Sequence, residues 1–184
     1  LDNFEKFLHE RSEHPEQAHH PVIIECALVH AQFETVHPFL DGNGRLGRLL
    51  IALLLHERRV LSQPLLYLSL YLQGHRLEYS DRLTAVRKNG DWEGWTKFFL
   101  RGVEQTALQA VETAKKVIAF RDQAIRTASS LGSAELKLTE FLFRHPLTDI
   151  QTAQKQLGVS YNTAAGAIAK LESANLVRET TGKQ

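Results

Sequence analysis

The sequence predicts an all-α protein in two parts, a helical bundle over residues 1–132 and a small helix-turn-helix unit over residues 133–184. The first observation behind this prediction is that apolar residues recur at helical spacing in almost every segment, and only residues 176–179 indicate the start of a strand. The second is a composition of 43% hydrophobic and 23% charged residues, which is ordinary for a globular protein with a buried core.

The chain begins with a short expected helix, in which Phe4 and Leu8 lie one turn apart. The polar, proline-containing stretch from Glu10 to His20 is expected to be a loop. Pro21 favours the first turn of a second helix, because its missing N–H group has no helical partner to lose there. We expect this helix to run to about Val36.

Pro38 is expected to end the second helix, because a residue before proline is pushed out of the helical region, and His37 should therefore be extended. A glycine-rich turn follows at residues 41–44. The next expected helix, residues 45–57, is apolar nearly all round, which predicts that it is the buried centre of the first part.

Further helices are expected at residues 64–72 and 75–88, and Asp91 is the expected cap of another. The aromatic residues of that helix are expected to pack in the core: Trp92, Trp95, Phe98 and Phe99. A separate long periodic helix then leads away from the bundle, and its last turns with residues 129–133 resemble a linker.

The second part is expected to contain helices at residues 136–144, 149–157 and 161–173, with a glycine-containing turn at residues 158–160. Two helices joined in this way are typical of a helix-turn-helix motif, whose second helix is the recognition element. That helix offers Tyr161, Asn162, Thr163 and Lys170 but no arginine. A role in protein contact or homodimer formation is therefore favoured over DNA binding, which usually needs a clearly basic face.

The charge balance and the cysteine content exclude several classes of protein. There are 22 basic and 21 acidic residues, so no overall charge draws the chain to nucleic acid or to a membrane surface. The longest apolar run, residues 49–55, is too short to cross a bilayer, and no leader opens the chain. The single cysteine, Cys26, rules out an internal disulfide and indicates the cytoplasm; inert packing is its expected role. The chain begins with Leu1 and contains no methionine, which is typical of a fragment or a processed product.

Residues 37–48 carry the strongest chemical signal in the sequence. A glycine-rich turn that feeds a helix N-terminus points backbone N–H groups at one place, where the helix dipole favours an anion such as phosphate. Arg45 and Arg48 lie on neighbouring positions of the first helical turns and can bind phosphate oxygens in a bidentate manner. Asp41 would repel a phosphate unless Mg²⁺ lay between them, and His37 titrates near neutrality and can accept a proton from a hydroxyl.

Three other motifs overlap these residues or lie near them, and they fit poorly. Gly42, Gly44 and Gly47 spell the dinucleotide-binding pattern, but that pattern requires a preceding strand and an acid about 20 residues further on. The P-loop requires Lys-Ser or Lys-Thr where Arg48 and Leu49 stand. No pair of histidines has the spacing of a zinc site, so structural zinc is not expected.

The stretch resembles the signature of the Fic (filamentation induced by cAMP) family, H-x-F-x-[DE]-G-N-G-R-x-x-R. It matches every specified position, with His37, Phe39, Asp41, Gly42, Asn43, Gly44, Arg45 and Arg48. The flanks from about Phe4 to Val103 resemble the family too, including residues 31–34 and 67–69. Residues 133–184 resemble the winged helix-turn-helix domains that follow the Fic bundle in a common bacterial subgroup.

The resemblance implies a Fic-type bundle that transfers AMP from ATP to a Ser, Thr or Tyr hydroxyl of a target protein and releases pyrophosphate. It makes His37 the general base, Phe39 a core anchor of the loop, and Asp41 the Mg²⁺ ligand. The expected nucleotide-binding residues are Gly42, Asn43, Gly44, Arg45, Leu46, Gly47, Arg48 and, beside the adenine, Tyr79. Self-modification is a further expectation.

Two features leave alternatives open. Doc-type kinases of this superfamily lack the equivalent of Gly44, so its presence favours adenylylation, although transfer of phosphate or another group stays an alternative. No inhibitory helix of the form [ST]-x-x-x-E-[GN] is found in the sequence, and we expect it in a preceding segment or on a partner protein. The remaining alternative is a DNA-binding regulator whose Fic-like part only senses a nucleotide.

Overall fold

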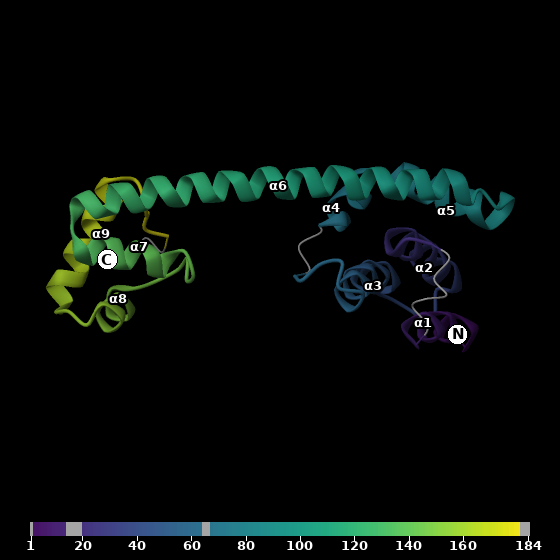
Figure 1. The fold of residues 1–184 in the computed structure, drawn as a ribbon, viewed down its shortest axis with the longest axis horizontal. Coiled ribbons are helices and arrows are strands. Elements are labelled where there is room, and N and C mark those ends of the chain that lie inside the picture. The colour runs from purple at the N-terminus through teal and green to yellow at the C-terminus, as the bar shows by residue number, and fades with distance from the viewer. Residues whose placement is uncertain (1, 14–19, 64–66, 181–184) are drawn as a thin grey trace. The chain divides into compact units, whose positions relative to one another are not determined.

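The computed structural model describes residues 2–13, 20–63 and 67–180, and all regular secondary structure in these residues is helical (Figure 1). This confirms the all-α fold class. The described chain divides into two compact units, Leu1–Glu112 (unit 1) and Thr113–Gln184 (unit 2), with the division inside helix α6. The proposed domain boundary at residue 132 stays a prediction. No described helix is both long enough and apolar enough to cross a membrane.

Helix α1, Asp2–Glu13, is longer than predicted, because Glu10–Glu13 are helical rather than part of a loop. These residues are polar, but none is a helix breaker, and the first proline comes only at position 15. The rest of the expected loop, residues 14–19, lies outside the described residues. Phe4 and Leu8 pack against the core of unit 1, as their spacing predicted.

Helix α2, Val22–Val36, is the most deeply buried element of unit 1 and follows Pro21, which is its N-cap. Cys26, Ala27, Val29 and Ala31 are at most 1% exposed. The indole Nε1 of Trp95 in α6 donates a hydrogen bond of 2.8 Å to the Ala27 carbonyl, so α2 and α6 are joined by a polar contact inside the apolar core.

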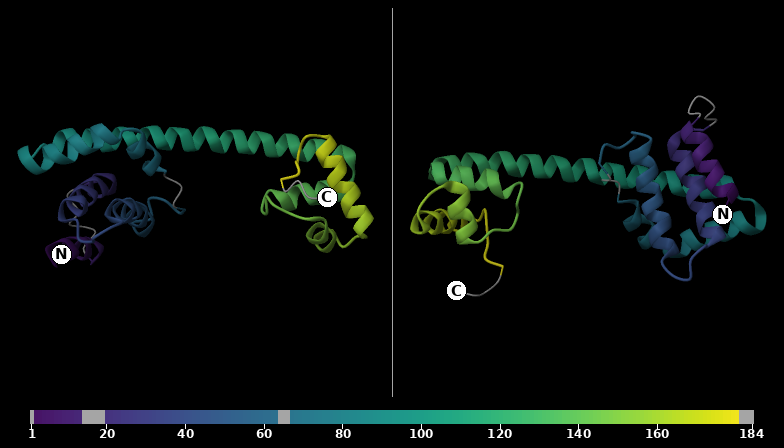
Figure 2. Two further views of the ribbon diagram at one scale, coloured as in Figure 1. Left: turned by 180° about the vertical axis from the view of Figure 1, so that it is seen from behind. Right: turned by 90° about the horizontal axis from the view of Figure 1, so that it is seen from below.

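Helix α3, Asn43–Glu57, packs against α2 and begins two residues earlier than predicted (Figure 2). One face is buried, with Gly47, Ile51, Leu54 and Leu55. The opposite face carries Leu46, Leu49 and Leu53, which are 41%, 52% and 54% exposed. The prediction that this helix is the buried centre of unit 1 is therefore wrong: its apolar residues surround the helix, but only one side meets α2.

Helices α4, Leu68–Gly74, and α5, Arg76–Asn89, come next in unit 1. Helix α5 agrees with its predicted range to within one residue. Helix α4 begins at Leu68, later than predicted, and residues 64–66 lie outside the described part of the chain.

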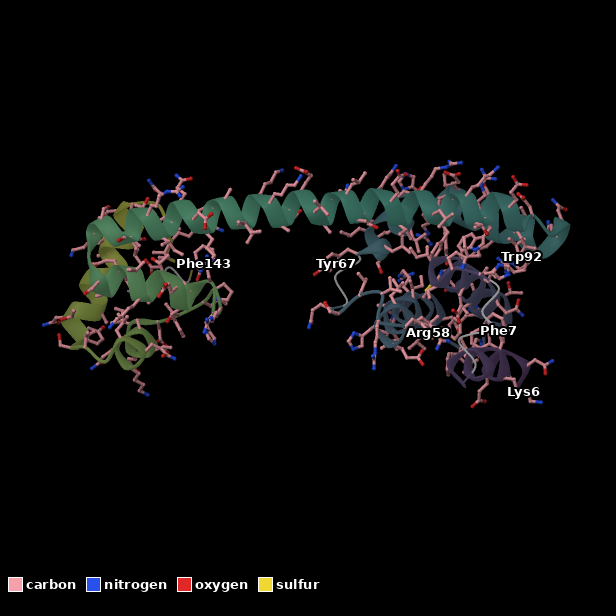
Figure 3. The ribbon with its side chains drawn as sticks, viewed as in Figure 1. Lys6, Phe7, Arg58, Tyr67, Trp92 and Phe143 are labelled. Atoms are coloured by element: carbon pink, nitrogen blue, oxygen red, sulfur yellow. The ribbon has the colours of Figure 1, made fainter. Side chains whose placement is uncertain are left out.

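Helix α6, Trp92–Leu131, is a single helix where two were predicted. Asp91 caps it as expected, since its Oδ1 accepts a hydrogen bond of 2.9 Å from the Gly94 N–H. Three of the four aromatic residues in its first turns fill the core, with Trp95, Phe98 and Phe99 at 0% exposure. Trp92 is 39% exposed because it lies at the very start of the helix (Figure 3), so its assignment to the core is wrong.

The expected linker at residues 129–133 is also wrong, since residues 129–131 complete α6 and only Gly132 separates it from α7. Ala128, one residue earlier, is fully buried in the core of unit 2, which holds this end of the helix in place. Ser130 bonds back to the Thr127 carbonyl at 2.7 Å, so its hydroxyl does not compete with the helix.

Unit 2 contains α7, Ser133–Leu142, α8, Ile150–Leu157, and α9, Tyr161–Ser173, around a small core. The predicted glycine-containing turn lies between α8 and α9. Asp149 and Ser160 accept hydrogen bonds from the backbone at the starts of the two helices, and Gly158 ends α8 with a left-handed φ of 64°.

The strand predicted at residues 176–179 is absent: this part of the described chain is irregular. A strand requires a neighbouring strand to complete its hydrogen bonds, and the described residues provide none. The start of a wing predicted at these residues is therefore not seen in the described part of unit 2.

Candidate active site

The segment between α2 and α3 begins at His37, whose backbone is left-handed, with φ 48° and ψ 56°. The prediction of an extended backbone is wrong, although the helix does end there. The left-handed conformation lets the His37 N–H donate to the Phe33 carbonyl at 2.9 Å and so closes the last turn of α2. The side chain is exposed to solvent, which leaves the imidazole available to a reacting group.

Asn43 holds the loop in shape. It is only 2% exposed, its Oδ1 accepts from the Phe39 N–H at 3.0 Å, and its Nδ2 donates to the Phe39 carbonyl at 2.6 Å. The Phe39 ring is 51% exposed and lies 6.4 Å from the ring of Phe33, so its expected role as a core anchor is wrong. The buried amide of Asn43 fixes the loop instead.

The N-terminus of α3 presents free backbone donors. Gly42 is the N-cap, with φ 84°, and provides no side chain to cap the first turn. The N–H groups of Asn43, Gly44 and Arg45 precede the first intrahelical bond, which runs from the Leu46 N–H to the Gly42 carbonyl at 3.0 Å. These donors and the helix dipole favour an anion.

Arg45 and Asp41 form an ion pair of 3.4 Å on the surface beside these donors. Their side chains are 76% and 93% exposed, so solvent screens the attraction and both groups can turn to a ligand at little cost. An exposed carboxylate of this kind suits Mg²⁺, which prefers oxygen ligands and keeps several waters.

Arg48 lies deeper, on the side of α3 that faces α2. A Cβ atom added to Gly44 would lie 3.1 Å from Arg48 Nη1, so the guanidinium approaches the backbone closely at this glycine. Gly47 is buried, and an added Cβ would lie 2.7 Å from Oε1 of Glu34. Contact of Gly47, or of Leu46, with a nucleotide stays a prediction.

A polar group beneath α3 was missed by the sequence analysis. His30 is fully buried, and its Nε2 lies 3.0 Å from the hydroxyl of Tyr79 in α5. The pKa of His30 is lowered to about 4, chiefly by burial; the Gly47 backbone raises it and the nearby charge of Arg48 lowers it, both by less. Burial also raises the pKa of Glu34, while His37, Arg48 and Arg87 lower it. The signal in the sequence was His30 and Glu34, one turn apart on a mostly apolar helix.

Tyr79 is placed beside this polar group, with its ring 5.9 Å from that of Trp95 and its hydroxyl against His30. Burial raises its pKa, as does the neighbouring Glu34. The structure thus gives Tyr79 a packing role in unit 1, and its contact with an adenine stays a prediction.

An exposed histidine thus lies beside an uncapped helix N-terminus and two arginines, an arrangement that favours an anion such as phosphate. The Fic/DOC family model matches residues 1–55 of this chain. The N-terminal segment of the chain is therefore similar to the Fic/DOC family.

A curated relative supports the same assignment. A protein of Aquifex aeolicus (strain VF5), named "Probable protein adenylyltransferase", is 33% identical over 67 residues. The matched stretch covers 36% of this chain and 21% of that protein, so the chain spans about a fifth of the length of the curated relative.

Proposed function

We propose that this chain carries the catalytic centre of a protein adenylyltransferase, which transfers AMP from ATP to the hydroxyl of a Ser, Thr or Tyr residue in a target protein. The observation that carries the proposal is the exposed His37 beside the uncapped N-terminus of α3 and its two arginines. The name of the Aquifex relative supports the same class of activity.

In this mechanism His37 accepts the proton of the target hydroxyl as its oxygen attacks the α-phosphorus of ATP. The bond between the α-phosphorus and the bridging oxygen breaks, and pyrophosphate leaves. The N–H groups of Gly42–Gly44 stabilise the charge that develops on the phosphate oxygens. Arg45 and Arg48 bind the outer phosphates and hold the triphosphate in line with the hydroxyl.

Asp41 is the residue that fits Mg²⁺. It is an exposed carboxylate beside the anion-binding turn, and phosphate oxygens and water would complete the ligand set. The metal would supply positive charge against the triphosphate. Without it, the negative charge of Asp41 opposes that of the nucleotide.

Unit 2 fits a role in contact with a protein, either the target or a second copy of the chain, better than a role in DNA binding. Lys170 is the basic side chain that the predicted recognition helix α9 could turn to DNA. It forms an ion pair of 2.7 Å with Glu135 instead. Self-modification, an inhibitory helix in a preceding segment or on a partner, and a cytoplasmic location belong to the same proposal.

The test is transfer of label from ATP labelled on the α-phosphate, with Mg²⁺ and a lysate of the native organism, using the protein at its full natural length. Replacing His37 by alanine should reduce labelling at least about 100-fold, since general base catalysis contributes this much or more. His56→Ala is the matched control, because His56 is an exposed histidine at the far end of α3, and it should label at the wild-type rate.

The mass added to the target distinguishes the alternatives. AMP supports the proposal, whereas phosphate alone identifies a kinase. Sequence-selective DNA binding that His37→Ala leaves unchanged, without any label on protein, would instead identify a nucleotide-sensing regulator.

A further inference from the structure

Glu34 lies one turn before His37 in α2, and its carboxylate packs against the first turns of α3. A Cβ added to Gly47 would lie 2.7 Å from Glu34 Oε1, and one added to Gly44 would lie 3.8 Å from the same atom. Glycine at position 47 therefore leaves space for this carboxylate. No sequence motif assigned a role to it.

The placement of Glu34 is costly. Its Oε1 is buried and accepts no hydrogen bond among the described residues. A buried carboxylate oxygen without a donor loses its hydration, which destabilises the folded state unless nearby positive charge offsets the loss.

The ionisable groups that face Glu34 come from each surrounding element. His30 precedes it by one turn in α2, His37 follows that helix, Arg48 comes from α3, and Tyr79 and Arg87 come from α5. The charges of His37, Arg48 and Arg87 lower the pKa of Glu34 against the effect of burial. The carboxylate is thus held in the field of several cationic groups.

The guanidinium of Arg48 also approaches the backbone of Gly44. Its Nη1 lies 3.1 Å, and Glu34 Oε1 3.8 Å, from the position that a Cβ of Gly44 would take. The carboxylate and the guanidinium therefore flank a single glycine of the anion-binding turn. Opposite charges attract, and the charge of Arg48 lowers the pKa of Glu34.

We propose that Glu34 is a positioning residue, whose carboxylate holds the Arg48 guanidinium beside the N-terminus of α3 so that it is ready to bind the outer phosphates of the nucleotide. This inference rests on the proposed function. Glu34 acts through Arg48 and contacts neither the nucleotide nor the target hydroxyl. A side chain at position 47 would displace the Glu34 carboxylate, and one at position 44 would press on the Arg48 guanidinium.

Glu34→Gln tests the proposal, since it removes the charge and keeps the shape. The KM for ATP should rise about 10-fold with kcat nearly unchanged, because an interaction made equally in the ground state and the transition state affects binding alone. Glu93→Gln is the matched control: Glu93 is exposed in α6 and pairs only with Lys97 among the described residues, so its loss should leave both constants unchanged.

A double-mutant cycle identifies the residue through which Glu34 acts. In an Arg48→Gln background, Glu34→Gln should raise the KM no further, because the group through which it acts is gone. Additive effects of the two substitutions overturn the proposal. The proposal is also overturned if Glu34→Gln leaves the KM unchanged only in an Arg87→Gln background, because Glu34 would then act through Arg87.

A measurement without nucleotide separates this inference from the proposed function. The ¹⁵Nε signal of Arg48 should be distinct in the wild-type protein and should move to the averaged position of mobile arginines in Glu34→Gln. An unchanged signal overturns the positioning role even if ATP is bound and transferred. A wild-type protein that does not transfer AMP contradicts the proposed function, and the Arg48 signal still decides the role of Glu34.

Discussion

The two units of this protein differ in how completely their buried polar groups are hydrogen-bonded. Unit 1 buries Glu25, His30 and Asn43 within or beside its apolar core and leaves one oxygen of Glu34 without a hydrogen bond. Unit 2 buries Glu135 and Thr139, and both are satisfied: Glu135 pairs with Lys170 at 2.7 Å, and Thr139 donates to the Glu135 carbonyl at 2.9 Å. The rest of its core consists of alanines and leucines.

The comparison shows where the fold serves something other than its own stability. In unit 1, His30, Glu34 and Asn43 lie near the start of α3. In unit 2, Glu135 instead joins α7 to α9 through Lys170. Buried groups that lower stability persist where they shape a site. The following predictions test this difference, from the largest expected effect to the smallest.

The pH dependence of stability should be dominated by His30. In the folded protein its pKa is about 4, against 6.5 for the free side chain. Between these values the unfolded chain binds more protons, so stability is full above pH 6.5 and falls as the pH drops towards 4, by an amount on the order of 3 kcal/mol. Urea unfolding at pH 7 and pH 4.5 measures the fall.

His30→Gln should reduce this fall, because glutamine does not titrate and can still bond to Tyr79. His145→Gln is the control from unit 2, where the histidine is exposed and stacks on Phe141, and its curve should follow the wild type. An equal fall in the wild type and His30→Gln would show that the buried imidazole is not responsible.

Two helical glycines should respond in opposite ways to alanine. At Gly47 the new Cβ would lie 2.7 Å from Glu34 Oε1 and 3.1 Å from a ring carbon of Phe33, so Gly47→Ala should destabilise the protein by about 2 kcal/mol. At Gly166 in α9 nothing lies within 4 Å, so Gly166→Ala should stabilise it by about 1 kcal/mol through helix propensity. Thermal unfolding of both variants checks the pair, and a neutral Gly47→Ala would contradict the close packing around Glu34.

The Glu135–Lys170 pair of unit 2 should give the smallest effect. Lys170→Met leaves a nearly buried carboxylate unpaired and should cost about 1 kcal/mol at neutral pH, whereas Glu135→Gln leaves only an exposed ammonium and should cost less. The hydrogen bond from Lys170 lowers the pKa of Glu135, so the pair stabilises the fold above the ordinary pKa of glutamate and is lost as the pH falls below it. Urea titrations of both variants at pH 7 and pH 3 decide the order; a larger cost for Glu135→Gln would contradict it.

The sequence predicted what depends on local periodicity and on one motif. Helices α2, α5, α8 and α9 were expected to within one or two residues, and so were the caps at Asp91 and Gly158. The last turn of α6 was not expected, because the serines and glycine at residues 129–133 indicated a linker. The burial of Ala128 prevails over that local signal.

Within the candidate site, the motif residues were identified but their arrangement was not. The left-handed backbone of His37 arises from closing the last turn of α2, a local helix-ending conformation that overrides the preference of a residue before proline. The roles of Asn43 and Glu34 depend on contacts with Phe39, Gly44 and Gly47, and spacing alone does not reveal these.

The double hydrogen bond between Asn43 and the backbone of Phe39 has a thermodynamic consequence. A loop that already has its final shape loses little backbone entropy when an anion enters, so the entropic cost of capture falls mainly on the rotamers of the exposed Arg45 and Asp41. Calorimetry should therefore register a modest heat capacity change, without the signature of a segment that folds as it binds.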